Sequence, residues 1–236
     1  MVKDFPESLL KQKHREYKKT FSNEFSLRTY RAISWFAKAQ SLQVENDDDL
    51  TFISYWIGFN ALYAAELPFD QSRGLSEKSS FKEFIQKIYR YDQNNRLYNL
   101  IWNRYPQSIR TLLNNQYTFG PFWQYQNGNY TEDAWKEDFS KNQTQALSYL
   151  SNKDNADMLL IIIFDRLYTI RNQIVHGGAT YSSSVNRTQV KDATRILGDF
   201  LPLMIDIMMN HSELDWGKPF YPPVDDASHK FSSQKI

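Results

Sequence analysis

Apolar residues recur along most of this chain with the spacing of one helix face rather than in strict alternation. Glycine and proline, at eight each in 236 residues, interrupt the pattern only rarely. No pair of segments has the alternating pattern of paired strands, so the sequence predicts an all-α protein. The expected helices span about 26–44, 49–66, 81–91, 96–115, 131–149, 156–175 and 186–209.

The segment 49–66 is apolar nearly all round, which is typical of a central helix packed on several sides. The three acids before it, Asp47, Asp48 and Asp49, are expected to cap its N-terminus. Residues 67–80 and 117–130 are expected to be loops, since both contain proline and glycine. The second loop carries several aromatic residues. It either covers a cleft or an interface, or folds back onto the core.

The composition limits the chemistry that the protein can perform and indicates the compartment in which it works. The absence of cysteine excludes disulfides, a thiol nucleophile and thiolate metal sites. His14, His211 and His229 lie on separate segments, so no metal is expected. The longest apolar run, Met158 to Phe164, is far shorter than the ~20 residues that span a bilayer, and the N-terminus lacks an apolar signal core. The sequence therefore indicates a soluble cytoplasmic protein without membrane association.

The net charge of +1 gives no general signature of polyanion binding. Cations nevertheless outnumber acids in residues 1–31 and 73–110, and either segment could contact a phosphate backbone. Arginines and aromatic residues also alternate between Tyr89 and Tyr105, as on some surfaces that bind single-stranded RNA. For all three we favour the simpler interpretation, in which apolar residues are packed and cations are solvated.

Only the segment from Arg171 to Gly178, with the sequence RNQIVHGG, suggests chemistry. Arg171 and His176 lie five residues apart at the expected end of a helix, and two glycines follow. Cations in a last turn, followed by glycine, are also the ordinary composition of a helix C-terminus. The residue types alone therefore fit a simple helix cap as well as a site.

The segment resembles HEPN domains, small all-helical bundles whose catalytic members carry Arg, usually a polar residue next, and His after four intervening positions. Arg171, Asn172 and His176 match that pattern, residues 52–63 resemble the second helix of such proteins, and residues 176–180 resemble the helix exit. The resemblance covers about 26–66 and 155–211. It implies a single domain over 1–236, a HEPN-like antiparallel helical bundle with an inserted helical region at about 67–154 and an extended C-terminal tail at 212–236.

The resemblance implies a metal-independent endoribonuclease, a toxin or defence effector without a cofactor. In such enzymes the ribose 2′-hydroxyl attacks its own phosphodiester. His176 is the expected acid and base, Arg171 the expected phosphate clamp, and Asn172 would orient the phosphate or the histidine. The alternative is a non-catalytic dimeric scaffold that binds nucleotide, RNA or a partner protein.

The geometry of a helix adds an expectation about assembly. Five positions place Arg171 and His176 about 140° apart around a regular helix, so one helix end makes a poor site. As in the HEPN ribonucleases that the chain resembles, we expect a homodimer that faces two such ends across an RNA-binding groove. Some of these proteins act with an antitoxin or nucleotidyltransferase partner, and there a tyrosine commonly follows two positions after the histidine. Gly178 occupies that position here, so regulation through that tyrosine is not expected. Tyr181 is close in sequence, but proximity alone does not make it a replacement.

Overall fold

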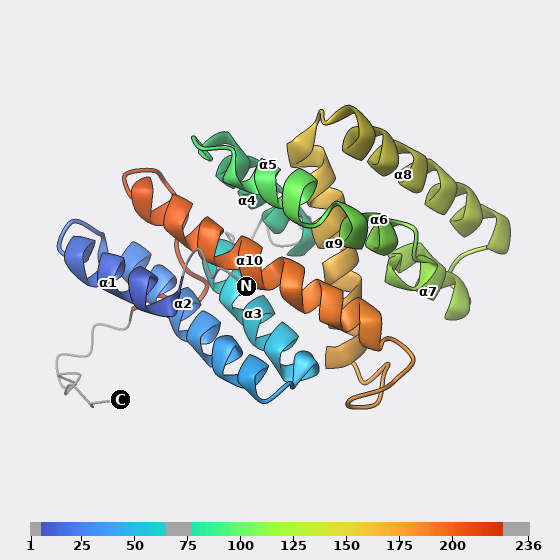
Figure 1. Cartoon of the computed structure of the whole chain (residues 1–236), viewed down its shortest axis with the longest axis horizontal. Helices are drawn as coiled ribbons and strands as arrows, with labels where there is room; N and C mark the ends of the chain where they lie inside the picture. Colours follow the sequence, from blue (N-terminus) through green and yellow to red (C-terminus); the bar gives the residue numbers. More distant parts are fainter. Residues whose placement is uncertain (1–5, 65–76, 224–236) are drawn as a thin grey trace.

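The computed structural model describes residues 6–64 and 77–223, with the side chains of 77–80 left aside. Every regular element within these ranges is a helix, which confirms the predicted all-α class (Figure 1). The predicted loop at 67–80 lies mostly outside the described residues, as does the end of the predicted tail beyond 223. Among the described residues, no helix is long and apolar enough to cross a membrane.

Four long helices surround the main core: α2 (Asn23–Val44), α3 (Asp48–Tyr63), α9 (Ala156–Val175) and α10 (Arg187–Asn210). The central helix α3 contacts the other three, as its apolar circumference predicts (Figure 1). Large side chains from all four helices fill the space between them, each less than 2% exposed: Phe36, Phe52, Trp56, Phe59, Phe164 and Phe200. Burial of these side chains is the main stabilising contribution to the bundle.

Two features of α3 follow directly from its sequence. The side chain of Asp47 accepts a hydrogen bond from Leu50 N at 2.9 Å, which confirms the predicted N-terminal cap. Gly58 allows close approach on two sides, because an added Cβ would lie 3.3 Å from the carbonyl oxygen of Ala32 and 3.0 Å from Leu201 Cδ2. The helix is therefore fixed at its start and tightly packed against α2 and α10 in its middle.

The segment between α3 and α9 forms a further helical layer (Figure 1). In chain order it contains α4 (Glu77–Arg90), α5 (Arg96–Asn99), the π-helix η1 (Leu100–Arg104), α6 (Pro106–Leu113), the 3-10 helix η2 (Gln116–Thr118), α7 (Gly120–Gln126) and α8 (Glu132–Asn152). In this layer α4, α6 and α8 pack against α9, while α4 and α5 also contact α10. Its helical character agrees with the predicted all-α class.

The single helix predicted over 96–115 is wrong. The chain leaves α-helical geometry after Asn99, and Tyr105 N bonds to Leu100 O at 2.9 Å to close the π-helix. Pro106 then opens a new helix, α6. Proline has no N–H to continue a preceding helix, but its fixed φ suits a first turn.

The irregular aromatic loop predicted over 117–130 is also wrong, since η2 and α7 occupy most of it. Phe119 and Phe122 are buried, and they pack edge to face against Phe139 and Trp135 of α8, respectively. These side chains therefore fold back onto the protein. The buried guanidinium of Arg166 on α9 lies 4.5 Å from the Phe119 ring centroid, which ties this aromatic cluster to the core.

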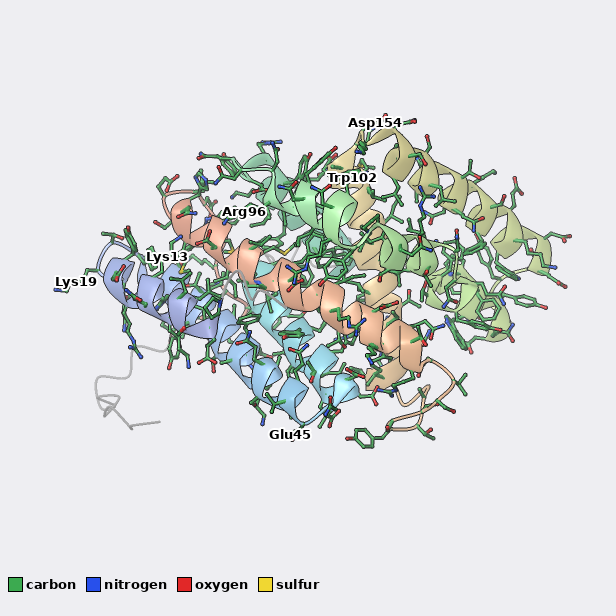
Figure 2. The ribbon with its side chains drawn as sticks, in the orientation of Figure 1. Lys13, Lys19, Glu45, Arg96, Trp102 and Asp154 are labelled. Carbon is green, nitrogen blue, oxygen red and sulfur yellow. The ribbon has the colours of Figure 1, made fainter. Side chains whose placement is uncertain are left out.

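An unpredicted helix, α1 (Glu7–Tyr17), packs against α2 and α10. It buries only Leu10 and His14, so its apolar periodicity is weak. Burial lowers the pKa of His14. Lys13 of α1 and Arg96 of α5 both pair with Asp206 of α10, so that one buried acid links three helices (Figure 2).

Several cations of the two basic segments are engaged within the fold. Arg104 pairs with Asp199 at 2.9 Å, and the ammonium of Lys87 lies 4.4 Å from the ring centroid of Trp216. Arg28 is 1% exposed. Arg28 is therefore not solvated, contrary to the favoured interpretation, and Arg104 and Lys87 are partly exposed but already engaged by partners within the fold. The tail is also less free than predicted, because Trp216 packs into the core cluster.

Candidate active site

The three predicted site residues lie together at the C-terminal end of α9. The helix ends at Val175, as predicted. Arg171 and Asn172 belong to its last turns and are half-buried, whereas His176 is the first residue beyond the helix and is exposed to solvent. The site is therefore an open helix end.

The backbone caps this helix end without help from the arginine or the histidine. The amides of His176, Gly177 and Gly178 donate to the carbonyl oxygens of Asn172, Ile174 and Gln173 at 3.0, 3.2 and 2.7 Å, respectively. Gly177 has a φ of 68°, the left-handed conformation that such a cap requires. Within the described part of the chain, neither the Arg171 nor the His176 side chain bonds to these carbonyls. Capping thus accounts for the glycines but not for Arg171 or His176.

Asn172 connects the other two members of the site. Nη1 of Arg171 donates to Oδ1 of Asn172 at 2.9 Å. Asn172 and His176 are four residues apart, which places them about 40° apart on one helix face. The hydrogen bond therefore draws the guanidinium toward the face that carries the histidine, although Arg171 itself starts about 140° away.

No acid neutralises Arg171 in the described ranges 6–64 and 77–223. Besides Asn172, it contacts the ring of Tyr168, with Cζ 5.8 Å from the ring centroid. A guanidinium carries its charge at all physiological pH values and offers donors in a planar fork that matches phosphate oxygens. Within the described ranges, the Arg171 guanidinium therefore has no carboxylate partner, and its donors suit an anion.

The inserted layer supports the helix end from one side. Gln173 Nε2 and Trp123 Nε1 both donate to the backbone oxygen of Tyr117, at 2.6 and 2.8 Å. Gln173 directly follows Asn172 in α9, so this contact holds the last turn of the helix against η2 and α7. The sequence gives no signal for the contact, because its partners are 56 residues apart.

A second support comes from the start of α3. The carboxylate of Asp49 accepts from the backbone N of Ser182 and from Nη2 of Arg187, both at 2.8 Å, and Asp47 accepts from the Tyr181 hydroxyl at 2.7 Å. These bonds fasten the loop that joins His176 to α10. The acids were predicted only as helix caps, and their role in holding this loop was missed.

We expect Asp49→Ala to loosen the 177–186 loop and to destabilise the protein by about 2 kcal/mol, since it removes a buried carboxylate from two donors. Hydrogen–deuterium exchange of the loop amides, together with urea unfolding, measures both effects. Asp48→Ala is the matched control, because that carboxylate lies 4.0 Å from Arg187 and is more exposed. Equal effects of the two substitutions would contradict the assigned role of Asp49.

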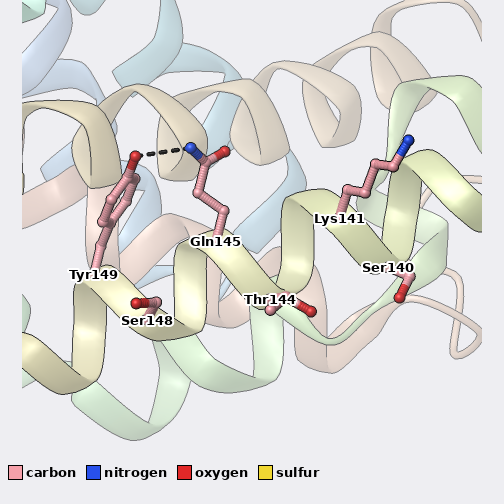
Figure 3. A pocket seen from close by; sticks show the side chains of 6 residues that line it. All are labelled: Ser140, Lys141, Thr144, Gln145, Ser148 and Tyr149. Atoms are coloured by element: carbon pink, nitrogen blue, oxygen red, sulfur yellow. Dashed lines mark hydrogen bonds between the residues drawn. The ribbon is translucent and has the colours of Figure 1, made fainter.

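Two hollows near the insertion differ in character. A pocket of about 440 Å³ lies beside the end of α9 and is lined by five separate parts of the chain. A wider depression of about 560 Å³ lies on α8, but all of its lining residues come from that single helix, and Gln145 there bonds to Tyr149 at 2.8 Å (Figure 3). Only the first is enclosed by several elements, as ligand sites usually are.

The described residues contain no group of three or more histidine, aspartate and glutamate side chains arranged to hold a metal ion. No protein-family model, curated protein or solved structure matches the chain. The assignment of function therefore depends on the residues at the end of α9 and on the chemistry that they can perform.

Proposed function

We propose that this protein is a metal-independent endoribonuclease of the HEPN type, with a composite site formed where two copies place their α9 ends across a shared groove. The observation that carries the proposal is a set of polar side chains at this helix end that the helix cap does not need. The backbone already satisfies the cap, yet an unneutralised arginine, an asparagine bonded to it and an exposed histidine remain.

These three side chains fit the needs of RNA cleavage by internal attack. The ribose 2′-oxygen bonds to phosphorus as a His176 imidazole takes its proton, and the bond from phosphorus to the 5′-oxygen breaks. A proton must then reach the departing 5′-oxygen, and the His176 imidazole of the second copy supplies it. Arg171 stabilises the negative charge on the phosphoryl oxygens, and Asn172 orients its guanidinium.

The composite arrangement explains why one helix end does not suffice. In a single chain the arginine and histidine leave the helix in different directions, and one imidazole cannot serve both ends of the reaction at once. Two facing helix ends provide two imidazoles and two guanidinium groups around one phosphodiester. We therefore propose a homodimer as the active form, with RNA as its substrate.

The proposal predicts that purified protein cleaves single-stranded RNA in the presence of excess EDTA. The products should carry 2′,3′-cyclic phosphate and 5′-hydroxyl ends, because the nucleophile is the substrate's own 2′-hydroxyl. End-labelling and mass spectrometry of the fragments identify these groups. RNA that stays intact, or fragments with 5′-phosphate ends, would overturn the proposed reaction. Substrate with a 2′-deoxy sugar at the cleaved position is the control and should stay intact.

A further inference from the structure

The pocket of about 440 Å³ beside the end of α9 has no part in the chemistry proposed above. Its walls come from η2, α7, α9, the loop after His176 and the start of α10. Pockets of ~300–1,000 Å³ enclosed by several elements are typical binding sites for small molecules or for parts of larger ones. The pocket is therefore large enough to hold one planar heterocycle.

The lining selects for an uncharged ligand. None of the residues around the pocket is ionisable at neutral pH, so a bound phosphate would find no counter-charge there. Trp123 and Val185 provide apolar surface, whereas Gln173, Asn186 and Gln189 provide amide groups that both donate and accept. A flat, neutral molecule with donors and acceptors on its edge matches this combination, and a nucleobase has these properties.

Part of this lining is already fixed in position. The backbone oxygen of Tyr117 accepts from both Trp123 Nε1 and Gln173 Nε2, which leaves Oε1 of Gln173 as an acceptor. Asn186 precedes α10 without capping it, and its buried Oδ1 has no hydrogen-bond partner among the described residues. A buried acceptor without a donor costs about 1–3 kcal/mol. Rotation of this carboxamide toward a base edge would provide the missing donor.

The pocket is also adjacent in sequence to the candidate active site. Gln173 follows Asn172 in α9, and Gly178 of the pocket wall is two residues beyond His176. Consecutive Cα atoms are 3.8 Å apart, so the backbone of the pocket edge and that of the candidate site are neighbours, and one RNA strand could reach both. Proteins that read single-stranded RNA usually take unstacked bases into such sites, beside aromatic side chains.

We infer that this pocket binds one unpaired base of the RNA, next to the phosphodiester that Arg171 and His176 act on. The inference rests on the proposed ribonuclease function, which it extends from the reacting phosphate to the choice of substrate. Arg171 provides affinity for any phosphate, whereas the neutral amides of the pocket discriminate between bases. Cleavage should therefore favour one base on one side of the cut bond.

The test uses the full chain carrying His176→Ala, so that RNA stays intact, and measures its binding to short single-stranded RNAs of each base by fluorescence anisotropy. We expect one base to be preferred. Gln189→Leu should weaken binding of the preferred RNA by about tenfold, because it removes a hydrogen-bonding amide at similar volume. Gln145→Leu is the matched control on the exposed face of α8 and should change nothing (Figure 3). Trp123→Leu is a second pocket variant, and circular dichroism measures whether it keeps its helical fold.

The outcomes separate this inference from the proposed function. If the wild type cleaves RNA but all four RNAs bind equally and Gln189→Leu has no effect, the pocket assignment is wrong while the ribonuclease stands. If the wild type does not cleave, the role of the pocket as a substrate subsite is lost, even where binding depends on the base. Base-dependent binding of free nucleosides, without any base dependence among the RNAs, would overturn the assignment to RNA.

Discussion

Substitution of His176 by alanine is expected to reduce RNA cleavage by about 10²–10⁴-fold, because it removes the group that moves protons in the proposed reaction. Arg171→Ala should reduce cleavage by about 10²–10³-fold through loss of charge stabilisation at the phosphate. Initial rates on a labelled RNA in EDTA give both values. Arg195→Ala on α10 is the matched control, since its side chain is half-exposed and distant in sequence. Its rate should equal that of the wild type.

Mixing the His176→Ala variant with the wild type tests the composite site directly. A dimer of one wild-type and one His176→Ala chain keeps only one of the two imidazoles that the proposed reaction uses. We expect this mixed dimer to cleave RNA as slowly as the variant alone. Half of the wild-type rate, in a sample shown by mass spectrometry to contain mixed dimers, would indicate that each chain forms a complete site by itself.

Arg28→Met is expected to cause the largest loss of stability, about 3 kcal/mol. The buried Arg28 guanidinium donates from Nη1 to the carbonyl oxygens of Leu62 and Trp216 at 2.8 and 2.7 Å, and from Nη2 to that of Ala64 at 3.1 Å. Methionine preserves the apolar stem but leaves these acceptors without donors, at about 1–3 kcal/mol for each fully buried group. Relief of the desolvated charge offsets part of this cost.

Urea unfolding of the two proteins measures this difference in the free energy of unfolding. Burial lowers the pKa of Arg28 to about 10, so the residue remains charged at neutral pH and the comparison can be made there. Arg31→Met, three residues along the same helix, is the control. Within the described residues, Arg31 donates to the Tyr221 carbonyl, an exposed contact. A similar loss for both variants would show that the Arg28 contacts are not responsible.

Helix α2, which carries Arg28 and Arg31, shows how much of the fold could be predicted from the sequence. The extent of α2 was predicted to within a few residues, because its periodic pattern spans many turns. The burial of individual residues was harder to predict: the aromatic Tyr30 is 58% exposed, whereas Arg28, in a segment whose cations were expected to be solvated, is buried. Periodicity reports the average face of a helix. It does not reveal which polar group is needed to satisfy the end of a neighbouring helix.

The candidate site, too, could be predicted from the sequence only in part. Arg171, Asn172 and His176 could be found from sequence because they lie within six consecutive positions and α9 ends at a clear glycine signal. Their surroundings could not be found. The Asp49 bonds to Ser182 and Arg187 join residues more than 130 positions apart, and the Gln173 contact depends on how the inserted layer folds. Such pairings arise only when the whole chain is packed.

The backbone cap at Gly177 and Gly178 has a further consequence for how this protein can change over time. Because the glycines hold the helix end by themselves, His176 and Arg171 can be replaced without loss of fold. Folding therefore exerts little selection on either residue, and only the need for activity would preserve them. A lineage that no longer required the proposed reaction could lose it through one substitution and keep an intact helical protein. Comparison of this pair among natural variants of the chain would then distinguish active enzymes from descendants kept as scaffolds.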